Sequence, residues 1–267
     1  MIRAPVVSGQ FYPDNASELR KVIEAFKPKD STRSGAYGLI LPHAGYVYSG
    51  KVAVSAVNKV LPKKRIVILG PNHTGYGEDF GMYSEGSWKI PFANLPIDCD
   101  LAQAILKSGT DIAPDTLSHK FEHSIEVELP ILYYFFGEFS FVPIVCRTAA
   151  LSVYEKVATQ IFSAVKNIKE DVLFVASSDM THYEPDSTAR RKDRAALTHI
   201  VNLDAEGLVK TVKKDNISMC GIAPVAILLL IMKKIGASKA SVSLYETSAD
   251  SGADSNSVVG YSGVVIS

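Results

Sequence analysis

The apolar positions of this chain form two alternating patterns. Short runs rich in β-branched and aromatic residues predict strands, whereas apolar residues that recur every three or four positions predict amphipathic helices. Helical spacing occurs within residues 19–26, 53–60 and 154–162. The predicted strands are residues 37–41, 65–70, 139–146, 171–177, 241–246 and 260–267. This alternation predicts an α/β fold in which helices cover both faces of a mostly parallel or mixed central sheet.

Two further segments complete the predicted organisation. Residues 221–232 are apolar but reach only about half of the ~20 residues that span a bilayer, so they predict a buried helix and no membrane insertion. Residues 84–96 lack a clear period and indicate an excursion or a hairpin. Because no repeat, linker or compositional break divides the chain, we expect residues 1–267 to form a single domain.

Composition excludes several classes of protein. Hydrophobic residues make up 47% and charged residues 21%, as in an ordinary globular protein. Lys+Arg and Asp+Glu both number 28, so no net charge attracts nucleic acid. The N-terminus lacks a signal-peptide core, and three cysteines are too few for a disulfide framework. These features predict a cytoplasmic protein.

Three predicted strands end at turns that carry a histidine. His43 follows residues 37–41, His73 follows residues 65–70, and Asp179 and His182 follow residues 171–177. The carboxyl ends of strands in an open α/β sheet form the ligand-binding crevice, so these side chains should converge. Imidazole is the commonest metal ligand and a frequent general base near neutral pH. The pattern therefore predicts a metal or acid–base site.

Asp179 and His182 allow two interpretations. If their turn opens a helix, Asp179 is either an N-cap or a carboxylate that shares a face with His182 and orients an imidazole. Both roles stay open on the sequence alone.

The segment 121–130 also carries possible site residues. On a helix, His123 and Glu126 would share one face and point into the crevice. For the glutamates of this segment, an acidic solvated face is the favoured interpretation. His119 and His199 lack a structural cue, and we expect them on the surface.

The cysteines differ in their surroundings. Cys220 directly precedes the apolar helix predicted at 221–232, so its thiolate would feel the positive end of the helix dipole and could be a nucleophile or a soft metal ligand. Burial as a small hydrophobic residue is an equally good interpretation. Cys99, which enters a predicted helix, and Cys146, which ends a predicted strand, match that simpler role.

Taken together, these motifs resemble the Memo family, which includes a eukaryotic mediator of cell motility. The resemblance extends from about residue 3 to the C-terminus, with the motifs in the family's order. The motifs that carry it are RAPVVSGQFYP (3–13), LPHAGYVYSG (41–50), ILGPNHTG (68–75), EHSIEVELP (122–130), SSDMTHYEP (177–185) and CGIAP (220–224).

This resemblance implies a fold similar to that of the class III extradiol ring-cleaving dioxygenases. It implies that the metal ligands are His43, His73 and Cys220. It also implies that Asp179, His182 and His123 serve as pocket acid–base residues. Iron or copper is the expected metal, and zinc is possible because a thiolate ligand favours softer ions. Independently of the resemblance, Tyr46 and Tyr48 follow His43 closely and either line the substrate pocket or simply pack.

Two functional hypotheses follow. The leading one is a metal-dependent oxidoreductase, similar to a dioxygenase, that acts on an unknown small molecule. The alternative is a non-enzymatic protein that sequesters a metal or binds a peptide or partner in the same cleft. A cysteine hydrolase that uses Cys220 with His182 and Asp179 ranks last, because the other histidines would have no role.

Overall fold

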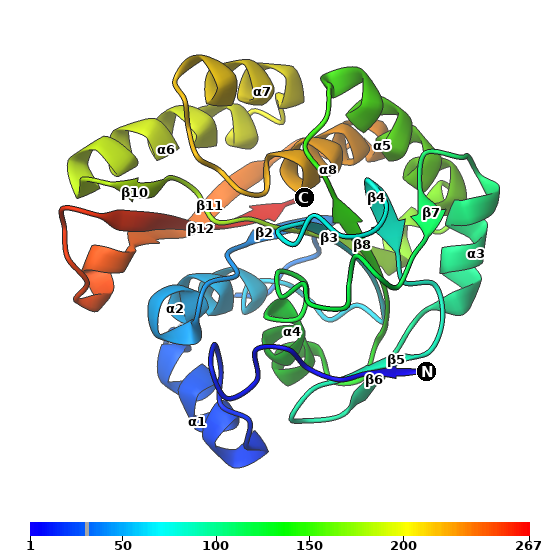
Figure 1. Cartoon of the computed structure of the whole chain (residues 1–267), viewed down its shortest axis with the longest axis horizontal. Helices are drawn as coiled ribbons and strands as arrows, with labels where there is room; N and C mark the ends of the chain where they lie inside the picture. The colour runs from blue at the N-terminus through cyan, green and yellow to red at the C-terminus, as the bar shows by residue number, and fades with distance from the viewer. Residues whose placement is uncertain (30–31) are drawn as a thin grey trace.

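The computed structural model describes residues 1–29 and 32–267 and is organised around a nine-stranded mixed sheet (Figure 1). At its centre, four parallel strands lie in the order β2, β9, β3 and β8. The sheet comprises β2 (Gly38–Leu41), β3 (Arg65–Pro71), β4 (Phe80–Met82), β7 (Ala113–Pro114), β8 (Ser140–Cys146), β9 (Val172–Ser177), β10 (His182–Glu184), β11 (Ala240–Thr247) and β12 (Val258–Ile266).

Antiparallel strands extend the parallel centre on both sides. β12 pairs antiparallel with β2, and β11 pairs antiparallel with β12. On the opposite side, β4 pairs antiparallel with β8. The prediction of a mixed sheet and the six predicted strands are confirmed.

Helices cover both faces of this sheet, as the sequence predicted (Figure 1). Alternate residues of a strand point to opposite faces, so Val67 of β3 packs in one apolar cluster and Ile68 in the other. The first cluster contains buried residues of α3, α5, α6, α7 and α8, and the second those of α1, α2 and α4. The helices are α1 (Ala16–Phe26), α2 (Tyr46–Val57), α3 (Cys99–Lys107), α4 (Glu128–Phe136), α5 (Leu151–Val165), α6 (Asp186–Val201), α7 (Ala205–Lys214) and α8 (Ile222–Ile235).

The apolar segment predicted as a buried helix is α8. Almost all of its side chains are buried. Lys233 and Lys234 occupy its last turn, where the negative end of the helix dipole stabilises cations. Gly236 ends the helix with φ +92°, a left-handed conformation that glycine adopts without strain. Among the described residues, no helix is long and apolar enough to cross a membrane.

The segment 84–96 forms a hairpin, one of the two structures expected for it. β5 (Ser87–Lys89) and β6 (Asn94–Pro96) pair antiparallel, and the N-terminal strand β1 (Ile2–Arg3) adds parallel to β5. The chain start is thereby held beside Trp88, which is buried. This small sheet lies on the same side of the central sheet as α1 and α4 (Figure 1).

Two local predictions are wrong. The turn that carries Asp179 opens no helix; it leads into the short strand β10, which pairs with β12, so Asp179 is not an N-cap. Likewise, α4 begins only at Glu128, so His123 and Glu126 lie in the preceding turns and share no helical face. In both places a carboxylate bonds to a distant segment: Asp179 accepts from His43 N, and Glu126 accepts from the backbone N–H groups of residues 6 and 7.

Candidate metal centre

Three neighbouring strand ends bring the site together. Because β2, β9 and β3 are adjacent and parallel, their carboxyl ends meet at one edge of the sheet. His43 follows β2, His73 follows β3, and Asp179 follows β9. The convergence expected from the sequence is therefore observed.

His43 is held by Ser177 of β9 and by Asp179 in the turn that follows this strand. Its backbone N–H donates to Asp179 Oδ1 at 2.9 Å, and its Nδ1 lies 2.7 Å from Ser177 Oγ. The side chain is almost completely buried, at 2% exposure. Burial, together with the nearby His73 and His123 rings, holds the pKa of His43 well below its usual value. The ring is therefore neutral, the form in which imidazole binds metals.

His73 is oriented by a carboxylate that the sequence analysis placed on a solvated face. Glu122 accepts hydrogen bonds from His73 N at 2.6 Å and from His73 Nδ1 at 2.9 Å. It also accepts from the backbone N–H groups of His123 and Ser124, each at 2.9 Å. Burial raises the pKa of Glu122, but the hydrogen bonds and charge of His73 and the other donors outweigh it and lower the pKa to about 2. Glu122 is thus a buried carboxylate that holds two of the site's turns.

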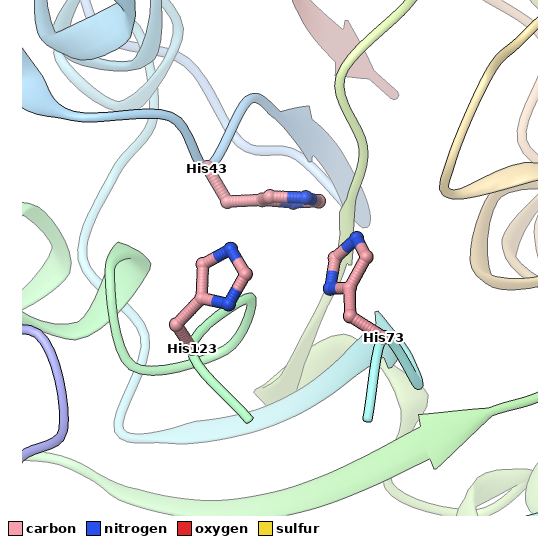
Figure 2. A group of neighbouring side chains, drawn as sticks. All are labelled: His43, His73 and His123. Atoms are coloured by element: carbon pink, nitrogen blue, oxygen red, sulfur yellow. The ribbon is translucent and has the colours of Figure 1, made fainter. Parts of the chain in front are cut away.

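The third imidazole comes from the loop before α4. The rings of His43, His73 and His123 lie with centroids 4.9 to 5.6 Å apart. Figure 2 shows the rings of His73 and His123 pointing toward that of His43. One ligand atom from each histidine lies within 4.8 Å of the others. The three histidines are therefore close enough together to be a candidate ligand group for a metal ion. Phe11 packs edge-on against the ring of His123.

Cys220 borders this cluster on the His43 side. Its Sγ lies 3.4 Å from His43 Nε2 and 3.2 Å from the backbone N of Asp179. As predicted, Cys220 lies just before α8, whose N-cap is Gly221. Gly221 N donates to Ser178 Oγ, directly after β9. Burial and the charge of Asp179 raise the pKa of the Cys220 thiol. The resemblance implied Cys220 as a metal ligand, but the close group of potential ligands is formed by the three histidines.

Asp179 and His182 flank the cluster but do not contact each other through any hydrogen bond seen in the described residues. Burial raises the pKa of Asp179 to about 6, against the opposing charge of His182 and the hydrogen bond from His43 N. His182 donates from Nδ1 to the Ser218 carbonyl at 2.8 Å and from its backbone N to Ser218 Oγ at 2.7 Å. Nδ1 of His182 is therefore a protonated ring nitrogen held by Ser218, and Nε2 is the ring nitrogen that this contact leaves over.

Tyr46 and Tyr48 occupy different environments. Tyr46 is 2% exposed, and its hydroxyl donates to the Val127 carbonyl at 2.8 Å, which ties α2 to the turn before α4. Tyr48 is 40% exposed. Packing accounts for Tyr46, and its contact with a substrate stays a prediction.

Several residues lie elsewhere than the sequence indicated. Glu122, Glu126 and Glu128 are buried, so the solvated acidic face is wrong. His119 is also completely buried, and its Nε2 donates to the Gly81 carbonyl at 2.9 Å.

The remaining corrections are smaller. His199 is only partly exposed and lies between Asp204 and Thr211, each at 2.9 Å. Cys99 is exposed at the start of α3, whereas Cys146 is buried as expected.

Sequence reasoning did not identify Ser177 as part of the site, and it favoured a solvated face for Glu122. Ser177 belongs to a strand predicted as core, and its hydroxyl is the only local signal of a different role. Glu122 stands directly beside His123, and that adjacency was the available signal.

Known proteins match this chain over almost its whole length. A family model described as "Memo-like protein" matches residues 3–265. A MEMO1 family protein of Methanopyrus kandleri is 39% identical over 99% of both chains. A second one, of Thermoplasma volcanium, is 40% identical over 99% of this chain and 98% of that protein.

A solved structure shows the same fold. An uncharacterised protein of Escherichia coli K12 superposes with a TM-score of 0.58 over 86% of this chain and 99% of that chain, at 13% sequence identity. At such low identity, the likeness concerns the arrangement of helices and strands alone.

Proposed function

This chain belongs to the Memo family, and we propose that it is a metal-binding protein whose ion is held by His43, His73 and His123. We further propose that the bound metal supports a redox reaction on an unidentified small molecule. Three free cysteines make the reducing cytoplasm the proposed location.

The observation that carries this proposal is that the Nδ1 atoms of two of the imidazole rings already have hydrogen-bond partners in the protein. His43 Nδ1 faces Ser177 and His73 Nδ1 faces Glu122. A metal-binding histidine usually donates its other ring N–H to such a partner, which fixes the tautomer and orients the ring. The residues present therefore fit a metal ion, and the Nε2 atoms of His43 and His73 are the ones left to bind it.

Cys220 supports a soft or borderline metal. Adjacent N and S ligands of one tetrahedral zinc ion are separated by about 3.5 Å, given metal–ligand distances of about 2.0 and 2.3 Å. The Cys220 Sγ to His43 Nε2 distance of 3.4 Å matches that separation. We propose Cys220 as an additional ligand and iron or copper as the metal, with zinc as a further candidate.

The flanking residues suit proton handling. When bound, the ion supplies Lewis acidity and, if it is iron or copper, one-electron redox chemistry. Asp179, with a pKa of about 6, can exchange a proton near neutral pH. His182 presents its Nε2 atom, because its Nδ1–H is held by Ser218. His123 takes the same acid–base role if it does not bind the metal.

A second candidate function is metal sequestration without catalysis. Its supporting observation is the Cys220 thiol beside a buried, neutral His43, because thiolate and imidazole together hold copper(I) well. Binding of a peptide or partner in the same cleft belongs to this alternative.

Metal analysis of the purified protein tests the proposal. We expect His43→Ala, His73→Ala and His123→Ala to lose most of the bound metal while the protein stays folded. His199→Ala is the control, because its ring contacts Asp204 and Thr211 instead. Wild-type metal content in all three variants would refute the proposed site. Full metal content in Cys220→Ala would remove Cys220 from the ligand set.

Oxygen consumption then separates the two functions. If the protein is a redox enzyme, its iron- or copper-loaded form consumes oxygen or forms peroxide faster than the free metal does. If the loaded protein suppresses the reaction of the free metal, sequestration is its function.

A further inference from the structure

A buried hydroxyl beside the cluster has more partners than protons. Ser177 Oγ lies 2.7 Å from His43 Nδ1, 2.8 Å from the Ser124 carbonyl and 2.8 Å from Glu128 Oε1. A serine hydroxyl has one proton to donate and two lone pairs that accept. All three contacts are hydrogen bonds only if two of the partners donate to Ser177.

The Ser124 carbonyl determines which partner donates in each of the three hydrogen bonds. A carbonyl oxygen only accepts, so the Ser177 proton goes to Ser124. His43 Nδ1 and Glu128 Oε1 must then both donate to Ser177 Oγ. For Glu128, this requires a neutral carboxylic acid.

The environment of Glu128 is consistent with that state. Its side chain is completely buried, and its second oxygen, Oε2, has no hydrogen-bond partner among the described residues. Burial, together with the charge of Asp179, raises the pKa of Glu128 well above its usual range. An ionised carboxylate with an unpaired oxygen would be far more costly at this position.

We propose that Glu128 and Ser177 form a positioning relay that fixes His43 as the Nδ1–H tautomer. Glu128 donates to Ser177, Ser177 donates to Ser124, and the remaining lone pair of Ser177 accepts from His43 Nδ1. The Nε2 lone pair of His43 is then left facing Cys220 and the histidine cluster. The consequence for metal binding rests on the proposed function.

The relay distinguishes His43 from His73. His73 donates to an ionised carboxylate, Glu122, which increases the basicity of the ring. His43 donates to a neutral hydroxyl that is itself held by a neutral acid. The site thus orients both rings while placing a negative charge behind only one of them.

Nitrogen NMR of the metal-free protein tests the tautomer directly. In the wild-type protein, long-range ¹⁵N–¹H correlations should show His43 with its proton on Nδ1. Ser177→Ala removes the acceptor, and we expect the proton to shift to Nε2 in a substantial fraction of molecules. Ser262→Ala is the matched control, because Ser262 is a buried strand serine whose hydroxyl has no partner among the described residues. An unchanged Nδ1–H tautomer in Ser177→Ala overturns the relay.

Infrared difference spectroscopy tests Glu128. The wild-type protein at neutral pH should show the C=O stretch of a protonated carboxylic acid, and Glu128→Gln should lose that band. The glutamine amide can still donate to Ser177, so the His43 tautomer should stay unchanged in this variant. If no such band is lost, Glu128 is ionised and the relay is wrong.

Zinc(II) affinity measured by chelator competition tests the functional consequence. Loss of an outer hydrogen-bond partner weakens metal binding by roughly 10–100-fold, and we expect at least about tenfold for Ser177→Ala and less than twofold for Glu128→Gln and Ser262→Ala. Equal affinity of Ser177→Ala and wild type overturns the relay's effect on binding. If the wild-type protein itself binds no zinc, iron or copper, the proposed function fails, whereas a tautomer shift in Ser177→Ala still supports the relay.

Discussion

Glu122 shows how one buried carboxylate organises the metal centre. Its two oxygens accept from three backbone N–H groups and one ring nitrogen, which belong to His73, His123 and Ser124. Each such charge-assisted bond favours the ionised form, so the pKa of Glu122 falls although the group is buried. The two histidine-bearing turns are thereby joined through a single side chain.

His119 gives a residue-level prediction about pH. Burial lowers its pKa to about 4, against a usual value of 6.5. Because the folded protein binds this proton less well than the unfolded chain, stability should fall as pH decreases from 6.5 toward 4. At one pKa unit per 1.36 kcal/mol, the contribution of His119 between pH 7 and pH 4.5 is about 2 to 3 kcal/mol.

Denaturant unfolding of wild type and His119→Gln at both pH values measures this contribution. The glutamine side chain does not titrate, so the variant should lose about 2 to 3 kcal/mol less than wild type on acidification. An equal loss in the two proteins would show that His119 is not responsible. The comparison across pH removes any constant effect of the substitution.

At the scale of elements, the end of β3 must approach the loop that carries His123. Gly70 makes this approach possible, because a Cβ atom there would lie 2.6 Å from Ser124 Oγ and 2.7 Å from Ile125 Cγ1. Both distances are well below ordinary van der Waals contact. A glycine is therefore required at this position by the packing of the loop against the strand.

We expect Gly70→Ala to destabilise the protein by about 1–3 kcal/mol through overpacking and to displace His123 from the cluster. Thermal or denaturant unfolding measures the first effect, and metal affinity measures the second. Gly35→Ala is the control: its Cβ would meet nothing within 4 Å, so its stability should be unchanged or rise slightly. Wild-type stability and metal affinity in Gly70→Ala would contradict this packing argument.

At the scale of the whole molecule, the N-terminal segment braces the site from outside. The Arg3 guanidinium donates to Glu126 at 2.7 Å, to the Glu122 carbonyl at 2.5 Å and to the His119 carbonyl at 2.8 Å, and it stacks over Trp88. Glu126 in turn accepts from the backbone N–H groups of residues 6 and 7 and from the Tyr12 hydroxyl. The loop that holds His123 is therefore clamped to the start of the chain.

Removal of Arg3 should lower the free energy of unfolding substantially. Both partners of the Arg3–Glu126 pair are buried, at 6% and 1% side-chain exposure, and breaking such a pair leaves an uncompensated charge that costs about 3–5 kcal/mol. We expect Arg3→Met to lose that amount in urea unfolding at neutral pH. Arg191→Met, at an exposed position of α6, should change stability by less than about 0.5 kcal/mol. A loss below about 1 kcal/mol for Arg3→Met would show that the clamp contributes little.

Six strands of the sheet, four of its covering helices and part of the site could be predicted from the sequence alone. Strands and amphipathic helices each have a local pattern of apolar residues, so β2, β3, β8, β9, β11 and β12 could be predicted. His43, His73 and Asp179 could be placed together because parallel strands deliver their carboxyl ends to one edge. These inferences need only the order of residues along the chain.

The pairing of the buried polar groups depends on contacts between distant segments and could not be predicted from the sequence. Burial of Glu126 depends on Arg3, 123 residues away, and the contact between Cys220 and His43 joins positions 177 residues apart. No local pattern distinguishes a glutamate on a solvated helix from one that meets such a partner. A buried polar group is stable only when its partners are supplied, and here distant segments supply them, so the environments of Glu122, Glu128 and His119 became known only from the folded chain.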